Sequence, residues 1–279
     1  MEQLTVEKQG FCGRFYPCIN AFDDKKAVIV VGGNEGAGMF SHGIGVLFAK
    51  RGIAALDVGF FAVPGLPKSL ENVPIEPIER AVEWLLARGY ERIAMYGFSK
   101  GAELSLLCAS VIPEITGVIG VSPIHCIWGE QDTLVSEFSY HGKGLPCMVA
   151  KIDYKRIVKN WIVEQQMRFV DMYEQALEGF LEETAIPVER IQGDILLIYA
   201  MEDTVWCSAK AAEYIRERLK QHQFIHSFTE LSYERASHIL IPLNPPALKM
   251  FRVERKYPKE CLESRLDAFE RTIAWLKGW

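Results

Sequence analysis

Two hydrophobic patterns alternate along the 279-residue chain. Short apolar runs rich in Val and Ile, which predict strands, cover residues 27–33, 52–61, 92–98, 117–123, 193–200 and 228–233. Helical patterns cover residues 41–52, 74–89, 102–112, 208–223 and 262–279. Most of the apolar runs lack polar alternation, as is typical of parallel strands buried on both faces. The alternation predicts an α/β fold, a mostly parallel sheet flanked by helices.

Two segments depart from this alternation. Residues 4–18 predict an antiparallel hairpin at the edge of the sheet, turning near Gly10 or Gly13. Residues 124–190 separate two predicted strands by more than an ordinary crossover and include a helical stretch at 154–183. An insertion of this length with its own secondary structure is typical of a lid or a pocket wall. We therefore expect residues 1–279 to form one domain with an inserted cap.

Composition and charge exclude several functional classes. The net charge of −5 argues against nucleic acid as a partner, because phosphate binding needs a basic surface. The first residues lack the pattern of a signal peptide, and no apolar run is long enough for a spanning helix. The 7 cysteines include no CxxC pair, so we expect reduced thiols. These features favour a cytoplasmic protein with no membrane partner; the oligomeric state stays open.

The first candidate for chemistry is Ser99 in "GFSKG", residues 97–101. Gly-x-Ser-x-Gly between a buried strand and a helix is the pattern of a nucleophile elbow, in which the serine sits on a strained turn. Gly97 and Gly101 would leave room for the neighbouring backbone. The alternative interpretation is a serine that only caps the helix. The strand before it and the helix after it favour the nucleophile.

A nucleophilic serine needs a base and an acid, which follow it in that fold in the order serine, acid, histidine. His238 follows the last predicted strand and is the candidate base. Glu202 and Asp203 both follow the strand before it, and the loop geometry favours Asp203. The remaining histidines precede Ser99, follow the wrong strand, lie in the insertion or lie near the end of a helix.

An oxyanion hole needs two N–H groups. The backbone N–H of Lys100, directly after the nucleophile, is one candidate. The other would come from the glycine-rich loop at residues 32–38, where Asn34 is favoured and Glu35 is the alternative. This loop is not G-x-G-x-x-G, so a dinucleotide site is not expected. We expect no metal and no organic cofactor.

Several stretches together closely resemble the catalytic domain shared by acyl-CoA thioesterases and bile acid-CoA:amino acid N-acyltransferases. They are "GGNEGAG" (32–38), "VPGLPKSLENVPIEPIERAVEWL" (63–85), "GFSKGAEL" (97–104), "IPVERIQGDILLIYAMEDTVW" (186–206) and "SHILIP" (237–242). The resemblance runs from about residue 20 to residue 250. It implies an α/β-hydrolase fold, related to dienelactone hydrolases, with Ser99 as nucleophile, Asp203 as acid and His238 as base.

Two differences from that family bear on function. Animal members carry a β-sandwich ahead of this domain, and we do not expect one in this sequence. The amino-acid-transferring branch has Cys where Ser99 stands. A thiol nucleophile leaves an acyl thioester that amines attack well, whereas a serine leaves an oxyester that activated water resolves. Ser99 therefore favours hydrolysis over transfer.

The sequence thus predicts a serine hydrolase that cleaves acyl-CoA or related thioesters, with a place in fatty acid metabolism. The alternatives are a hydrolase of small esters, an amino acid N-acyltransferase and a non-catalytic binding protein. Two further residues are candidates for substrate contact. Lys68 could line the entrance of the active site, or it could be an ordinary surface lysine. Trp206 could form a wall of an acyl-binding pocket, or it could belong to the core. The Lys100 side chain could meet a phosphate or pair with Glu103, three residues on.

Overall fold

The computed structural model describes residues 1–36 and 38–279. Its centre is a sheet of eight strands in the order β1-β2-β4-β3-β6-β7-β12-β13. These are β1 (Glu2–Leu4), β2 (Cys12–Tyr16), β3 (Lys26–Val31), β4 (Ala54–Gly59), β6 (Arg92–Phe98), β7 (Ile115–Val121), β12 (Asp194–Ala200) and β13 (Phe228–Tyr233). All pairings from β4 to β13 are parallel, and those of β1 with β2 and β2 with β4 are antiparallel. The predicted parallel sheet with an antiparallel edge is confirmed.

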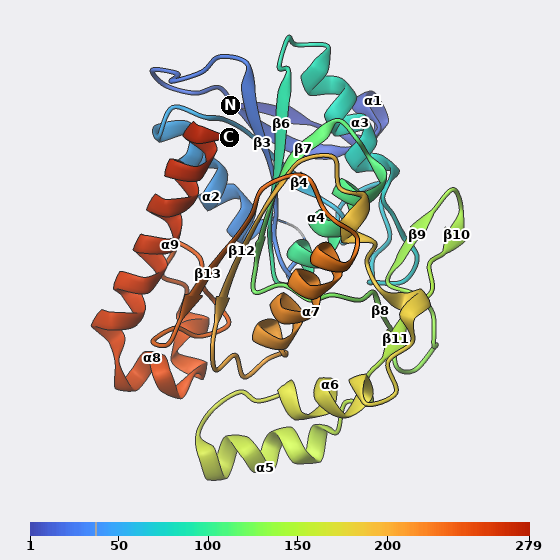
Figure 1. Ribbon diagram of the computed structural model, residues 1–279, viewed down its shortest axis with the longest axis vertical. Coiled ribbons are helices and arrows are strands. Elements are labelled where there is room, and N and C mark those ends of the chain that lie inside the picture. Colours follow the sequence, from blue (N-terminus) through green and yellow to red (C-terminus); the bar gives the residue numbers. More distant parts are fainter. Residues whose placement is uncertain (37) are drawn as a thin grey trace.

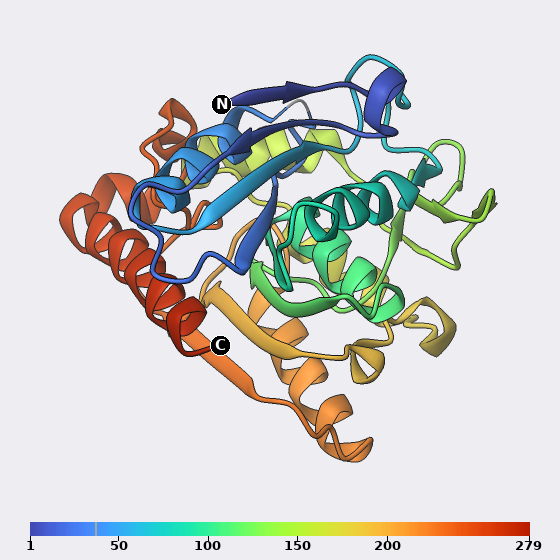
Figure 2. The ribbon, with the colours of Figure 1, turned by 90° about the horizontal axis from the view of Figure 1, so that it is seen from above.

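Helices cover both faces of the sheet (Figures 1 and 2). On one face lie α2 (Met39–Lys50) and α9 (Pro258–Gly278), and on the other α3 (Glu76–Leu86), α4 (Lys100–Val111) and α7 (Ser208–Gln221). Successive strand residues point to opposite faces. In β3, for example, Val28 and Val30 therefore pack with α2 and α9, while Ile29 packs with α3 and α4. This two-sided burial explains why the strands read as continuous apolar runs.

The N-terminal hairpin is present, with Glu2 paired to Phe15. Its connection contains the short helix α1 (Val6–Gln9), which ends at Gly10 with a φ of 79°. The alternative turn at Gly13 is wrong, because Gly13 lies inside β2. A Cβ at Gly13 would stand 2.4 Å from the carbonyl oxygen of Asp57. Gly13 is therefore needed for close strand pairing and does not make the turn.

Residues 124–190, called the insertion below, form a separate group of short elements. They are β8 (Trp128–Gly129), β9 (Phe138–Tyr140), β10 (Lys143–Gly144), β11 (Met148–Val149), α5 (Tyr154–Glu164), α6 (Val170–Leu177), η1 (Glu182–Thr184) and η2 (Val188–Arg190). Strand β9 pairs with β5 (Val73–Pro74), which joins the insertion to the chain before α3. The stretch predicted as helical at 154–183 is divided, since Gln165 adopts a φ of 52° and ends α5. That the insertion acts as a cap stays a prediction.

The last segment follows β13. It contains η3 (Pro246–Met250) and α8 (Arg252–Lys256) before α9. Helix α9 packs Phe269, Ile273 and Leu276 onto the sheet, which fixes the C-terminal end of the chain against the core. Within the described ranges, no helix combines the length and the apolar character that crossing a bilayer requires.

Candidate active site

Ser99 stands at the corner between β6 and α4. Its φ and ψ are 56° and −119°, a strained conformation for a residue other than glycine. A Cβ at Gly97 would lie 1.9 Å from the carbonyl oxygen of Gly101, and a Cβ at Gly101 would lie 2.0 Å from that of Gly32. Both flanking positions therefore admit only glycine. The elbow pattern of the sequence has a direct steric cause here.

The structure brings together the three side chains that the sequence singled out. His238 Nε2 lies 2.8 Å from Ser99 Oγ, and His238 Nδ1 lies 2.7 Å from Asp203 Oδ2. A carboxylate can only accept, so Nδ1 carries the hydrogen and donates it to Asp203. In the neutral ring Nε2 is then free to accept the hydrogen of the serine hydroxyl. Their catalytic roles stay a prediction.

Asp203 is held by more than the histidine. Its Oδ1 accepts from the backbone N–H of Val205 at 2.8 Å, and its Oδ2 accepts from Ser208 Oγ at 2.7 Å. Glu202, the alternative acid, is exposed on the same loop and makes none of these contacts. Ser208 was not among the residues that the sequence predicted for the site. Its position as the first residue of α7, five residues after Asp203, was the available signal.

His238 is fixed from two further sides. Ser122 Oγ donates to its carbonyl oxygen at 2.7 Å, and the ring of Trp206 stands edge-on to the imidazole with centroids 5.7 Å apart. The Trp206 indole N–H in turn donates to the Ser122 carbonyl at 2.9 Å. Trp206 is buried, and it packs directly against the candidate base. Contact with an acyl chain stays a prediction for this residue.

The two candidate oxyanion donors flank Ser99. Lys100 begins α4, where the first N–H groups have no acceptor within the helix. A Cβ at Gly33 would lie 3.3 Å from Ser99 Cβ, so the loop that carries Asn34 runs beside Ser99. Asn34 is exposed there. Ala37, in the same glycine-rich loop, lies outside the described residues.

Glu35 folds back onto its own loop. Its Oε2 accepts from the Gly33 N–H at 2.7 Å, so that N–H is already occupied. Its Oε1 is buried and has no hydrogen-bond partner in the described part of the chain. Burial raises the pKa of Glu35 above its ordinary value. The Glu35 side chain thus stabilises its own loop through the bond to Gly33. A role of Glu35 in substrate binding stays a prediction.

The Lys100 side chain points away from solvent into a buried cluster. Its Nζ lies 2.8 Å from Glu103 Oε2 and 2.5 Å from Glu137 Oε2, and the side chain is only 7% exposed. Burial alone would lower the pKa of Lys100, but the two carboxylates raise it above its ordinary value. Of the two interpretations left open, pairing with Glu103 is the one present. The second partner, Glu137, comes from the insertion and was not foreseen.

Glu103 completes this cluster. Its Oε1 accepts from the backbone N–H of Trp128 at 2.9 Å, which connects the start of the insertion to α4. Burial raises the pKa of Glu103 to about 7, against the opposing effect of Lys100. The Lys100 Nζ also stands 5.1 Å from the centroid of the Trp206 ring. The cluster therefore connects α4, the insertion and the ring of Trp206.

Lys68 lies apart from these groups. It is exposed in the segment between β4 and β5 and forms no ion pair with any described residue. A place at the entrance of the site stays a prediction.

An open cleft of about 470 Å³ lies beside the acid. Its walls are the 166–174 part of the insertion, the loop after β12, the loop after β13 and α8. Asp203 and Ser237 line it, while Ser99 is absent from its described lining. The cleft therefore gives solvent access to the acid side of the three residues.

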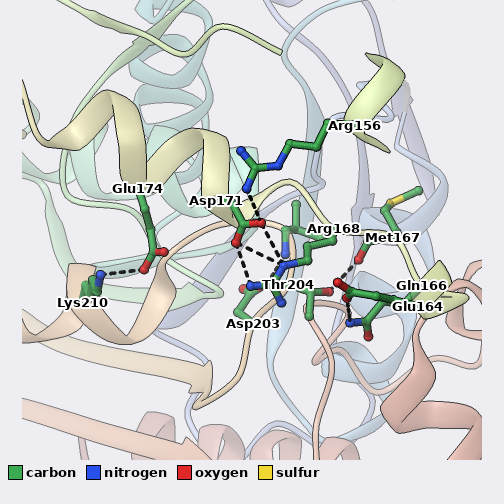
Figure 3. A network of polar contacts seen from close by, with 11 residues as sticks. Arg156, Glu164, Gln166, Met167, Arg168, Asp171, Glu174, Asp203, Thr204 and Lys210 are labelled. Carbon is green, nitrogen blue, oxygen red and sulfur yellow. Dashed lines mark hydrogen bonds and ion pairs between the residues drawn. The ribbon is translucent and has the colours of Figure 1, made fainter. Parts of the chain in front are cut away.

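The insertion is bonded directly to the loop that carries Asp203 (Figure 3). Thr204 Oγ1 donates to the Met167 carbonyl at 2.8 Å, and the Thr204 carbonyl accepts from the Phe169 N–H at 2.8 Å. Beside these bonds, Asp171 accepts from Arg156 and Arg168. The hydrogen bonds from Arg168 lower the pKa of Asp171. The acid loop and the insertion are thus positioned together.

Residues 73–256 match the family described as "BAAT / Acyl-CoA thioester hydrolase C terminal". The chain belongs to this family. The matched range includes Ser99, Asp203 and His238, whereas Asn34, Glu35 and Lys68 precede it.

Curated relatives in the family are longer. Human acyl-coenzyme A thioesterase 6 is 30% identical over 179 residues, which cover 63% of this chain and 40% of the relative. Mouse peroxisomal succinyl-coenzyme A thioesterase is 24% identical over 74% of this chain and 47% of its own length. The chain therefore matches less than half the length of these relatives.

Solved structures share the fold at low identity. A crystal structure described as that of a putative dienelactone hydrolase from Klebsiella pneumoniae superposes with a TM-score of 0.61 at 15% identity, covering 100% of this chain and 98% of that one. A puromycin-hydrolysing peptidase from Mycobacterium tuberculosis gives 0.60 at 17% identity, covering 95% of this chain and 36% of the other. These similarities confirm the α/β-hydrolase fold that the sequence predicted.

Proposed function

We propose that this chain is a serine hydrolase that cleaves acyl-CoA or a related thioester through an acyl-enzyme. The observation that carries the proposal is the continuous hydrogen-bonded path from Ser99 through His238 to Asp203, at 2.8 and 2.7 Å. Membership of a family whose curated members include acyl-coenzyme A thioesterases supports the substrate class. The strained serine at the elbow, next to a helix N-terminus, suits attack on a carbonyl carbon.

In the first half of the reaction, Ser99 Oγ attacks the thioester carbonyl while His238 Nε2 takes the hydroxyl proton. Asp203 stays ionised and stabilises the imidazolium that forms. The N–H groups of Lys100 and Asn34 hold the oxyanion, each contributing about 3 kcal/mol to transition-state stabilisation. The C–S bond then breaks, His238 protonates the departing thiolate, and the acyl group remains on Ser99 as an oxyester.

In the second half, His238 removes a proton from a water molecule, which attacks the oxyester. The tetrahedral intermediate collapses, the acid product leaves and the proton returns to Ser99. The steps balance without an oxidant, a reductant or a further group. An amine in place of water would give transfer, which a serine oxyester disfavours.

The direct test is thiol release from a panel of acyl-CoA esters, from acetyl to long-chain, compared with rates on p-nitrophenyl esters. We expect the thioesters to give the higher kcat/KM. Replacing Ser99→Ala should lower kcat by about 10⁶-fold. Ser110→Ala is the matched control, since Ser110 lies near the other end of the same helix, where its hydroxyl donates to the Leu107 carbonyl, and it should keep full activity.

The competing functions give different results in the same assay. Faster turnover of oxyesters than of thioesters would assign a carboxylesterase. Amide products formed with glycine or taurine would assign an acyltransferase, and the Ser99→Cys variant should increase that fraction if the nucleophile decides the outcome. Unchanged thiol release in Ser99→Ala would refute the proposed nucleophile, and no turnover of any ester would indicate a binding protein.

A further inference from the structure

Helix α5 turns its apolar side toward solvent. Tyr154, Val158, Trp161 and Ile162 are 67%, 58%, 45% and 70% exposed, and none of the residues of α5 is buried. The spacing of i, i+4, i+7 and i+8 places these four on one face of the helix. We call them the α5 stripe. The helix lies at the lower edge of the molecule, with α6 between it and the sheet (Figure 1).

The inward side of α5 is less apolar than the α5 stripe. Ile157, Asn160 and Glu164 are half-buried, and their i, i+3 and i+7 spacing defines the side that meets the protein. An ordinary surface helix buries its apolar face and exposes its polar one. Helix α5 keeps a large apolar face in contact with water instead, so this face is suited to a partner.

Lysines border the α5 stripe. The i+3 spacing places Lys155 beside Val158 and Lys159 beside Ile162. Both lysines are exposed, and neither forms an ion pair with a described residue. By contrast Arg156, on the other side of the helix, pairs with Asp171 at 3.0 Å. The free positive charge on α5 is therefore concentrated next to its exposed apolar residues.

A groove continues this surface. It has a volume of about 470 Å³ and is lined by Trp161, Ile162, Gln165, Lys249 and Arg255. Two more cationic side chains therefore stand at the end of the α5 stripe. The chain as a whole carries a net charge of −5, so this basic and apolar face differs from the average surface. The combination matches a partner that is apolar inside and anionic outside.

We propose that the α5 stripe docks the protein on the surface of an anionic lipid bilayer. An amphipathic helix with Trp, Ile and Val on one side and Lys at its border can lie at the boundary between headgroups and acyl chains. The apolar side chains would enter that boundary while Lys155 and Lys159 meet the anionic headgroups. A second copy of the chain fits less well, because pairing two α5 stripes would bring the lysines of both copies together. Docking does not depend on the proposed hydrolase activity.

Vesicle flotation tests the proposal with the full chain. We expect binding to phosphatidylcholine vesicles that contain phosphatidylserine, weak binding to pure phosphatidylcholine, and loss of binding at high salt. The Val158→Ser/Ile162→Ser variant should bind about tenfold more weakly, because the apolar area is removed. The Lys155→Gln/Lys159→Gln variant should bind roughly 25-fold more weakly, about fivefold for each lysine.

Matched controls separate docking from general surface effects. Val163 is 71% exposed on α5 but lies off the α5 stripe, so Val163→Ser should bind like wild type. The charge control is Lys50→Gln, since Lys50 is exposed at the end of α2 and Figure 1 shows α2 far from α5. The Ser99→Ala variant should also bind normally, which separates failure of docking from failure of the proposed catalysis. Circular dichroism would verify that each variant is folded.

A second readout locates the contact on the helix. Lipids brominated on their acyl chains quench tryptophans that enter the bilayer, and Trp161 is the tryptophan on the α5 stripe. Quenching should be present in wild type and absent in Trp161→Phe. Equal binding to neutral and anionic vesicles, or binding that survives Val158→Ser/Ile162→Ser, would overturn the proposal. A third result would also overturn it: the wild-type protein does not bind vesicles but forms a dimer, and Val158→Ser/Ile162→Ser dissociates that dimer. This result would assign the α5 stripe to contact with a second copy of the chain.

Discussion

The charged cluster beside Ser99 and the charged cluster at the outer end of the insertion have opposite surroundings. The inner cluster, Lys100 with Glu103 and Glu137, is almost completely buried. The outer cluster, Asp171 with Arg156 and Arg168, is partly exposed. Water can replace a lost partner in the outer cluster but not in the inner one. Loss of an ion pair should therefore lower the free energy of unfolding strongly in the inner cluster, which holds α4, and only slightly in the outer cluster, which joins α5 and α6.

The largest effect is expected at the centre of the inner cluster. Lys100→Met would leave Glu103 and Glu137 buried without their cation, and should lower the free energy of unfolding by about 3–5 kcal/mol. Urea denaturation measures this loss. Lys210→Met is the control, because Lys210 pairs with Glu174 at 2.6 Å in an exposed position and should cost less than about 1 kcal/mol. Equal losses in the two variants would contradict the comparison.

The inner cluster should also make stability depend on pH. Burial raises the pKa of Glu103 to about 7 in the folded chain, against an ordinary 4.5. Between these values the unfolded carboxyl has lost its proton while the folded one keeps it, so stability falls as pH rises from about 4.5 to about 7. Glu103→Gln should flatten this slope. Urea denaturation midpoints of both proteins at several pH values would measure this pH dependence. The same slope in Glu103→Gln as in wild type would show that other groups determine the pH dependence of stability.

A smaller effect is expected where the insertion meets the acid loop. Thr204→Val removes the hydrogen bond from Thr204 Oγ1 to the Met167 carbonyl and should cost about 1 kcal/mol of stability. Thr204→Ser keeps the hydroxyl and serves as the control. If this contact helps to position Asp203, kcat should fall in the valine variant and recover in the serine variant. A loss of stability alone would limit Thr204 to a structural role.

The smallest effect is expected in the outer cluster. Asp171→Asn removes the charge that Arg156 and Arg168 share, yet the free energy of unfolding should change by only about 0–1 kcal/mol, because both arginines reach solvent. Thermal melting at low and high salt measures the change. A loss as large as that of Lys100→Met would remove the distinction between the two clusters.

Much of the fold could be predicted because parallel strands that are buried on both faces have continuous apolar sequences. The order of Ser99, Asp203 and His238 along the chain, and the position of each just after a strand of the parallel sheet, predict these three as one group. Parallel strands place such loops at the same edge of a sheet, so their convergence needed no side-chain detail.

The supporting contacts could not be predicted in the same way. Glu137 pairs with Lys100 although the two are 37 residues apart in the sequence. Ser122 donates to the carbonyl of His238, which is 116 residues away. No local pattern marks such a partner, because only the packing of the insertion on α4 brings the groups together. The break at Gln165 depends on a single backbone conformation, which hydrophobic spacing does not encode.

The central claim is that the path from Asp203 through His238 activates Ser99 as a nucleophile. Intact-protein and peptide mass spectrometry of samples quenched during acyl-CoA turnover tests it most directly. The account predicts a mass increase equal to the acyl group, confined to the peptide that contains Ser99 and abolished in Ser99→Ala. An adduct on another residue, or full turnover in that variant with no adduct, would contradict it.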